Sequence, residues 1–171
     1  MVGGVVCKWL RRLKVVAMAT QTRDETSRYT QLLADGLASQ FNFVMQVKSV
    51  ILQPSAGMTM QGPGFYEISG LAWSGQGRIT KVEISADGGR SWAEADLQEP
   101  IMPQCFVRFR LPWHWQGQPA VLQSRATDEH GSTQPTRAAW ITQFAPGEEY
   151  HNNSIQSWDV TAAGEVRNVY I

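Results

Sequence analysis

The stretch Val82-Glu-Ile-Ser-Ala-Asp-Gly-Gly-Arg-Ser-Trp92 decides the fold class of this chain. Its first residues alternate apolar and polar side chains, with Val82 and Ile84 on one face, which is the period of a half-buried β-strand. Asp87-Gly-Gly89 then supplies residues that tolerate positive φ and predicts a tight hairpin. We expect Trp92, which comes just after the turn, to fold back onto the same apolar face.

Short segments of similar pattern lie on both sides of this hairpin, and each is bounded by Gly, Pro or Asp. Strands at this spacing, with turn signals between them, are typical of an all-β sandwich. We predict a loop over residues 112–117. The predicted strands cover residues 41–52, 64–73, 79–85, 90–97, 106–111, 119–127, 138–144, 155–160 and 166–171.

The composition gives little support to a charged partner. Lys and Arg number 15 and so do Asp and Glu, so nothing electrostatic favours nucleic acid or an anionic membrane. Seven tryptophans in 171 residues indicate a surface that a partner protein buries, because Trp is enriched at interfaces. Cys7 and Cys105 lie in unlike contexts, which predicts two unpaired thiols.

No catalytic constellation emerges from the residues themselves. His114, His130 and His151 are far apart in sequence, and no Gly-x-Ser-x-Gly elbow is present. No His or Cys pair has the spacing of metal ligands, and Asp87-Gly-Gly89 lacks the acidic residues that a calcium loop requires. The residues alone therefore predict a β-sandwich module with an interface rather than an enzyme.

The first forty residues show a different pattern from the strand-rich segments that follow them. Residues 5–16 predict a strand, and residues 22–33 predict a short helix with Thr22 as N-cap and Glu25 three positions on. The basic residues follow the apolar run instead of preceding it, so we identify no secretory signal, and the run is too short to cross a bilayer. A strand that begins without a cap leads us to expect the end of a larger upstream domain.

Three motifs carry a resemblance to a known family: VEISADGGRSW at 82–92, FRLPWHW at 109–115 and SRATDEHGSTQP at 124–135. Together they resemble the C-terminal dimerisation domain of molybdenum-cofactor oxidoreductases of the sulfite oxidase family. The segments 62–74 and 150–158 are similar to the bacterial sulfane/sulfite dehydrogenase branch, which acts in thiosulfate oxidation.

The resemblance implies a domain organisation. In the family this domain is an immunoglobulin-like β-sandwich that pairs two subunits and packs on the cofactor domain. We therefore expect residues 1–40 to be the end of the molybdopterin-binding domain plus a linker helix. Residues 41–171 are then the immunoglobulin-like dimerisation domain.

The resemblance also implies a cofactor contact near the start of the chain. Val6, Cys7 and Lys8 occupy the positions that touch the molybdopterin, although Val6 replaces a serine and so lacks its hydroxyl. The Lys8 ammonium suits a cofactor phosphate. The molybdenum-ligating cysteine belongs to the upstream domain, and neither Cys7 nor Cys105 matches it. We expect this chain alone to bind no molybdenum cofactor and to be inactive.

The remaining roles also follow from the family. In the intact enzymes, substrate sulfur attacks a Mo=O group and electrons leave to a c-type cytochrome subunit, in the periplasm. We expect a homodimer through the sandwich, with the cofactor domain supplied in cis or in trans. The expected dimer-interface residues are Arg108, Arg110, Trp113 and Trp115. The expected pocket-rim residues are His151 and Asn152.

Two other interpretations stay open. One is a free-standing immunoglobulin-like module that binds carbohydrate or protein through the tryptophans of residues 112–116. The other is the product of a truncated or split gene, without activity of its own.

Overall fold

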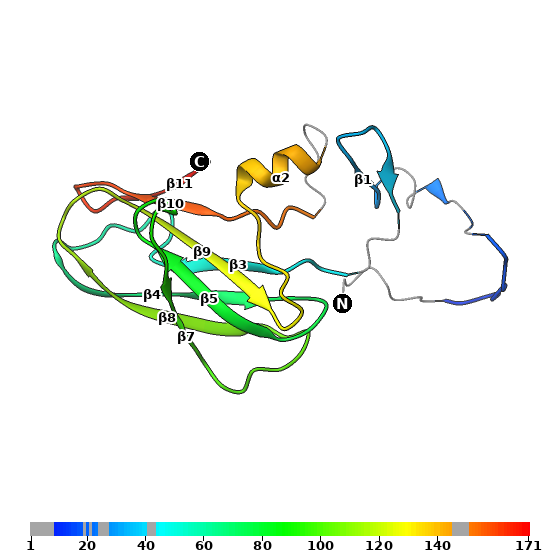
Figure 1. The fold of residues 1–171 in the computed structure, drawn as a ribbon, viewed down its shortest axis with the longest axis horizontal. Helices are drawn as coiled ribbons and strands as arrows, with labels where there is room; N and C mark the ends of the chain where they lie inside the picture. The colour runs from blue at the N-terminus through cyan, green and yellow to red at the C-terminus, as the bar shows by residue number, and fades with distance from the viewer. Residues whose placement is uncertain (1–8, 19, 21, 24–27, 41–43, 145–150) are drawn as a thin grey trace.

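The computed structural model describes residues 9–18, 20, 22–23, 28–40, 44–144 and 151–171, and its body is a pair of stacked antiparallel sheets (Figure 1). The first sheet has the order β11-β10-β9-β5-β6 and the second the order β3-β4-β8-β7. This architecture confirms the predicted all-β sandwich. The strands are β3 (Lys48–Gln53), β4 (Gly64–Trp73), β5 (Ile79–Ser85), β6 (Ala93–Glu94), β7 (Asp96–Leu97), β8 (Val107–Trp115), β9 (Ala120–Asp128), β10 (Ser157–Val160) and β11 (Val166–Val169).

The core lies between the two sheets. Every second side chain of each strand points into it. Val82 and Leu122 from the first sheet meet Ile68 and Phe109 from the second, and all four are fully buried. Burial of each such side chain contributes about 1.5–3 kcal/mol. Gly70 lies opposite Phe109 in the β4–β8 register, and a Cβ there would come 2.4 Å from the ring. The missing side chain therefore makes room for the Phe109 ring.

The hairpin signal is confirmed. Gly88 and Gly89 adopt φ of 73° and 88°, the left-handed region that the turn requires. The prediction for Trp92 is wrong. Ala93 pairs with the inward-facing Ile84, so the preceding residue points to the opposite, outer face of the sheet.

The segment after this hairpin crosses from one sheet to the other. A single strand was expected over residues 90–97, but β6 pairs with β5 in the first sheet and β7 pairs with β8 in the second. Ala95, between them, is buried and donates its backbone N–H to Val82 O at 2.9 Å. The chain therefore closes one edge of the sandwich here.

The strand predicted over residues 138–144 is a helix, α2 (Arg137–Gln143). The hydroxyl of Thr136 accepts the backbone N–H of Ala139 at 3.2 Å, which caps the first turn. Trp140 and Phe144 are four residues apart and both buried, with ring centroids 4.9 Å apart. One turn of helix brings these two rings together, whereas a strand would separate them by about 13 Å.

The loop predicted over residues 112–117 is also wrong at its start, because β8 continues to Trp115. Pro112 pairs with Glu67 of β4. The other neighbour of β8, the two-residue β7, pairs only with Phe109 and Arg110. At Pro112 the outer edge of β8 is therefore open, which is where a strand tolerates a residue without an N–H donor.

The N-terminal predictions need correction in the described residues. Residues 9–16 form no strand, and residues 5–8 lie outside the described part. The predicted helix 22–33 does not reach its expected end, because β1 (Gln31–Leu32) pairs with β2 (Ala38–Ser39) in a hairpin. This hairpin lies against α2, where Ala34 N donates to Gln143 O at 3.3 Å. The strand predicted to start at 41 begins at Lys48, with 41–43 outside the described residues.

Candidate functional site

The outer face of the second sheet is the first candidate site. β4 and β8 pair in antiparallel register, so that Arg108 lies opposite Leu71 and Arg110 opposite Ser69. Both arginines are exposed, while the intervening Phe109 is buried. Strand alternation therefore places the two guanidinium groups on the solvent side of the sheet, as the sequence pattern predicted.

This face is hollowed. A cavity of about 400 Å³ opens over β3, β4 and β8. Its lining combines two arginines, one carboxylate, two small residues and two longer side chains of β3. The lining residues are Arg108, Arg110, Glu67, Ser69, Gly70, Leu52 and Gln53. A concave face of this mixed chemistry can receive side chains from a partner protein.

The charges on this face form no ion pair among the described residues. No ion pair in that part of the chain includes Arg108, Arg110 or Glu67. Arg110 Nη2 donates a hydrogen bond to Gln98 Oε1 at 3.3 Å, toward the β7 side of the sheet. Glu67 was missed by the sequence analysis, although its alternation with Tyr66 and Ile68 in the expected strand 64–73 marked it as an outer residue.

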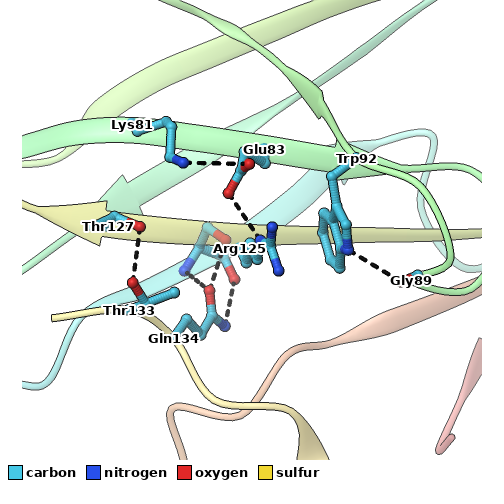
Figure 2. A network of polar contacts seen from close by, with 9 residues as sticks. Lys81, Glu83, Gly89, Trp92, Arg125, Thr127, Thr133 and Gln134 are labelled. Carbon is cyan, nitrogen blue, oxygen red and sulfur yellow. Dashed lines mark hydrogen bonds and ion pairs between the residues drawn. The ribbon is translucent and has the colours of Figure 1, made fainter. Parts of the chain in front are cut away.

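The outer face of the first sheet is different, because Glu83 there forms ion pairs with two cations of the same sheet (Figure 2). Glu83 accepts from Arg125 Nε at 2.8 Å and lies 3.3 Å from Lys81 Nζ. The hydrogen bond from Arg125 is the main cause that lowers the pKa of Glu83. Trp92 covers the Arg125 guanidinium and donates its indole N–H to Gly89 O at 3.0 Å. Lys81, Glu83 and Arg125 are therefore paired within the chain, whereas the exposed Glu94 opposite Glu83 forms no ion pair among the described residues.

The two tryptophans proposed for an interface point inward. Trp115 is 1% exposed and donates its indole N–H to Gln118 O at 2.7 Å. Trp113 packs against the core, with its ring centroid 6.5 Å from Tyr66 and 6.4 Å from Trp115. Trp115 therefore has no surface to offer to a second subunit, and that part of the prediction is wrong. The burial of Trp115 removes one of the two tryptophans on which the carbohydrate-binding interpretation depended, while Trp113 stays partly exposed.

His151 and Asn152 lie where the chain enters the last two strands. The Asn152 carbonyl accepts Lys48 Nζ at 2.5 Å, and its side chain accepts the backbone N–H of Ser154 at 3.0 Å. Burial lowers the pKa of both Lys48 and His151. Asn152 lines a cavity of about 90 Å³, whose lining does not include His151. Their role at a pocket rim stays a prediction.

A buried amide that the sequence did not reveal ties this region to the sandwich. Gln134, 3% exposed, accepts the backbone N–H of Ser49 at 2.9 Å and donates to Ser154 O at 3.1 Å. The Ser49 hydroxyl also donates to Gln134 at 2.8 Å. A single side chain therefore joins β3 to the segment that precedes β10. A glutamine beside Pro135 carries no sequence signal for such a role.

The expected cofactor contacts Val6, Cys7 and Lys8 fall outside the described residues. Within the described ranges, no group of three or more His, Cys, Asp or Glu could hold a metal ion. Cys105 is an exposed free thiol. None of the helices in the described part is long and apolar enough to span a bilayer.

The described fold is an all-β sandwich whose second sheet carries a hollowed, charged outer face. A family model described as the Mo-co oxidoreductase dimerisation domain matches residues 39–158. The chain belongs to this family.

Known relatives are longer proteins. The chain is 30% identical over 167 residues to the nitrate reductase (NAD(P)H) of Hordeum vulgare, covering 81% of this chain and 18% of that protein. It is 27% identical over 172 residues to the mitochondrial sulfite oxidase of Mus musculus, covering 91% and 31%. The crystal structure of the sulfane dehydrogenase SoxCD from Paracoccus pantotrophus superimposes with a TM-score of 0.89 at 47% identity, over 96% of this chain and 42% of that one. This chain therefore spans less than half the length of each.

Proposed function

We propose that this chain is the dimerisation part of a molybdopterin-dependent sulfite or sulfane dehydrogenase, in which it pairs two copies of the enzyme. The observation that carries the proposal is the likeness to sulfane dehydrogenase SoxCD, which extends over 96% of this chain at 47% identity. The TM-score of 0.89 supports a shared topology over nearly the whole chain. The sulfite oxidase of Mus musculus supports the same chemistry at greater distance.

The cofactor's role in this proposal belongs to another part of the enzyme. When bound, a molybdenum cofactor supplies the oxygen transfer and electron acceptance that sulfur oxidation requires. The described residues hold no cluster that could ligate the metal, so no step of the reaction is assigned to them. Lys8 is proposed to approach a phosphate of the cofactor, since an ammonium pairs with an anionic oxygen.

The partners follow from the same proposal. The chain pairs with a second copy, contacts the cofactor domain, and belongs to an enzyme that passes electrons to a c-type cytochrome in the periplasm. The resemblance to the sulfane/sulfite dehydrogenase branch supports the cytochrome and the location. Fractionation of cells that produce the chain from its own gene, followed by immunodetection, tests the location, and recovery outside the periplasmic fraction contradicts it.

Sedimentation equilibrium combined with metal analysis tests the central proposal. The purified chain is expected to sediment at twice its mass of 19.1 kDa and to carry no stoichiometric molybdenum. A monomer at micromolar and higher concentrations would contradict the dimerisation role. Stoichiometric molybdenum in the isolated chain would contradict the assignment of the cofactor to another part of the enzyme.

A further inference from the structure

We infer that the hollowed outer face of β3, β4 and β8 is the surface on which the second copy docks, with Glu67 of each copy pairing with Arg108 of the other. The inference rests on the proposed dimerisation and names its surface and its charge pairs. The sandwich has two outer faces, and they differ in how their charges are satisfied. The first sheet pairs Lys81, Glu83 and Arg125 within the chain. In the second sheet, Glu67 and Arg108 form no ion pair among the described residues.

The position of the two charges fits two-fold symmetry. Arg108 lies opposite Leu71 and Glu67 opposite Pro112, so the row formed by Ser69 and Arg110 lies midway between them. At a rise of about 3.3 Å per residue, Glu67 and Leu71 are separated by roughly 13 Å along β4. We place a two-fold axis between the two stacked sheets, perpendicular to the strands and level with Ser69. Rotation about this axis reverses the strand direction of the second copy relative to the first. It brings Glu67 of one copy over the Leu71–Arg108 end of the other.

Such an interface makes every contact twice, because the two copies present the same patch. Stacked sheets lie about 10 Å apart, a distance that the long side chains of Glu and Arg together span. Arg110, which lies near the proposed axis, would otherwise face its own copy. Its guanidinium is held by Gln98 on the side of β7, and Asp96 is its register partner there. The two Arg110 residues therefore lie near the axis in both copies, and the Asp96 carboxylate beside each of them supplies an opposite charge.

Apolar side chains on the same face supply the rest of the contact. Leu52 at the edge of the hollow is 51% exposed, and Phe65, two residues before Glu67 on β4, is 72% exposed. Enrichment in aromatic residues and Arg is expected of a specific protein–protein contact, and opposite charges across it fix the register of the two partners. The hollow of about 400 Å³ would be filled by the partner's Leu52 and arginine side chains.

The test is a charge swap on the full 171-residue chain. Glu67→Arg and Arg108→Glu each place like charges opposite each other at two symmetric positions. Each is therefore expected to raise the dimer Kd by roughly tenfold or more. Combining both substitutions reverses the polarity of each pair and should return the Kd to within about threefold of the original value. Sedimentation velocity over a concentration series measures the Kd, and circular dichroism confirms that each variant is folded.

Lys81→Glu on the other sheet is the matched control, and its Kd is expected to stay unchanged. Three results are decisive. Loss of dimer in the single variants with recovery in the double variant supports the inference. Unchanged dimerisation in all variants overturns this surface while the proposed dimerisation stands. A monomeric unmodified chain contradicts the proposed function itself, and this inference with it.

Discussion

The guanidinium carbon of Arg125 lies 4.2 Å from the centroid of the Trp92 indole, and the Nε of Arg125 donates a hydrogen bond to the Glu83 carboxylate at 2.8 Å. The Trp92 side chain is thus fixed on the outer face by a cation and by its own hydrogen bond to Gly89 O. This contact joins the end of the hairpin to the middle strand β9 of the first sheet. It gives the VEISADGGRSW motif a structural role beyond its turn.

A double-mutant cycle should measure this contact. Trp92→Leu and Arg125→Met each remove one partner and keep much of the apolar volume. We expect the two changes to be non-additive by about 0.5–1 kcal/mol in the free energy of unfolding, which is the range for a partly exposed cation–π pair. Urea denaturation of the four proteins provides the measurement. Additive effects would show that the stacking contributes nothing.

Gly70 should tolerate no side chain. A Cβ at this position would lie 2.1 Å from Val50 O and 2.4 Å from Phe109 Cζ, so either the β3 backbone or the core ring must move. Gly70→Ala is expected to reduce the free energy of unfolding by about 2–3 kcal/mol. Gly64→Ala, in the same strand, is the matched control, because its Cβ would come no closer than 4.0 Å to Tyr66. Similar losses in both variants would contradict the steric explanation.

The sandwich could be predicted because its signals are local. Val82 and Ile84 alternate with polar residues, and the following Asp-Gly-Gly has few conformational alternatives to a turn. Alternation also places Arg108 and Arg110 on the outer face without knowledge of the partner strands. Alternation could not predict which face of the sheet Trp92 occupies, because the turn before Trp92 does not fix the register of β6. The pairing of Ala93 with Ile84 fixes that register.

The wrong secondary-structure predictions arose where a short apolar segment fits both a strand and a helix. The segment 138–144 contains alanines and two aromatic residues, and its length suits a strand as well as two turns of helix. The Thr136 cap and the packing of Trp140 against Phe144 select the helix, and both are local contacts that the sequence analysis did not weigh. The burial of Trp115 is a similar case, since its place in the core depends on the continuation of β8 past Pro112.

The acid stability of the hairpin should depend on Asp87. Its carboxylate accepts hydrogen bonds from the Ser91 hydroxyl at 2.6 Å, the Ser91 N–H at 2.9 Å and the Ser85 hydroxyl at 2.7 Å, which hold the pKa of Asp87 well below its ordinary value of 3.8. Because the pKa of Asp87 is lower in the folded chain than in the unfolded chain, the Asp87 carboxylate stabilises the fold at pH values above 3.8. This stabilisation is lost as the pH falls toward the folded pKa. Asp87→Ala should therefore lower the Tm at pH 6.

The same variant gives a second readout. The Tm difference between Asp87→Ala and the unmodified chain should shrink as the pH is lowered below about 4, because protonation removes the same advantage from Asp87. Glu94→Gln, at an exposed carboxylate of β6, is the control and should change the Tm little at either pH. A Tm difference that is independent of pH would assign the effect of Asp87 to backbone geometry instead of charge.

Gln134 should be required for the junction between β3 and the last strands. Gln134→Met keeps the volume of the side chain but leaves the backbone N–H of Ser49 without its acceptor and the carbonyl of Ser154 without its donor, while the Ser49 hydroxyl keeps Ser124 as a partner. Because these groups are buried, we expect a loss of about 2–4 kcal/mol in the free energy of unfolding. Gln143→Met, at an exposed position of α2, should have a small effect. Hydrogen exchange should be faster at the Ser49 amide in the Gln134 variant, and unchanged protection there would contradict the network.

His151 should make the fold sensitive to mild acid. Burial lowers its pKa below the ordinary value of 6.5, so the unfolded chain takes up a proton more readily than the folded one. The stabilisation is complete above pH 6.5 and is lost as the pH falls from there through the lower folded pKa. His151→Gln cannot take up this proton, so its Tm should fall less between pH 7 and pH 5 than that of the unmodified chain. Titration by NMR checks the cause directly, and a His151 resonance that titrates at or above 6.5 would contradict it.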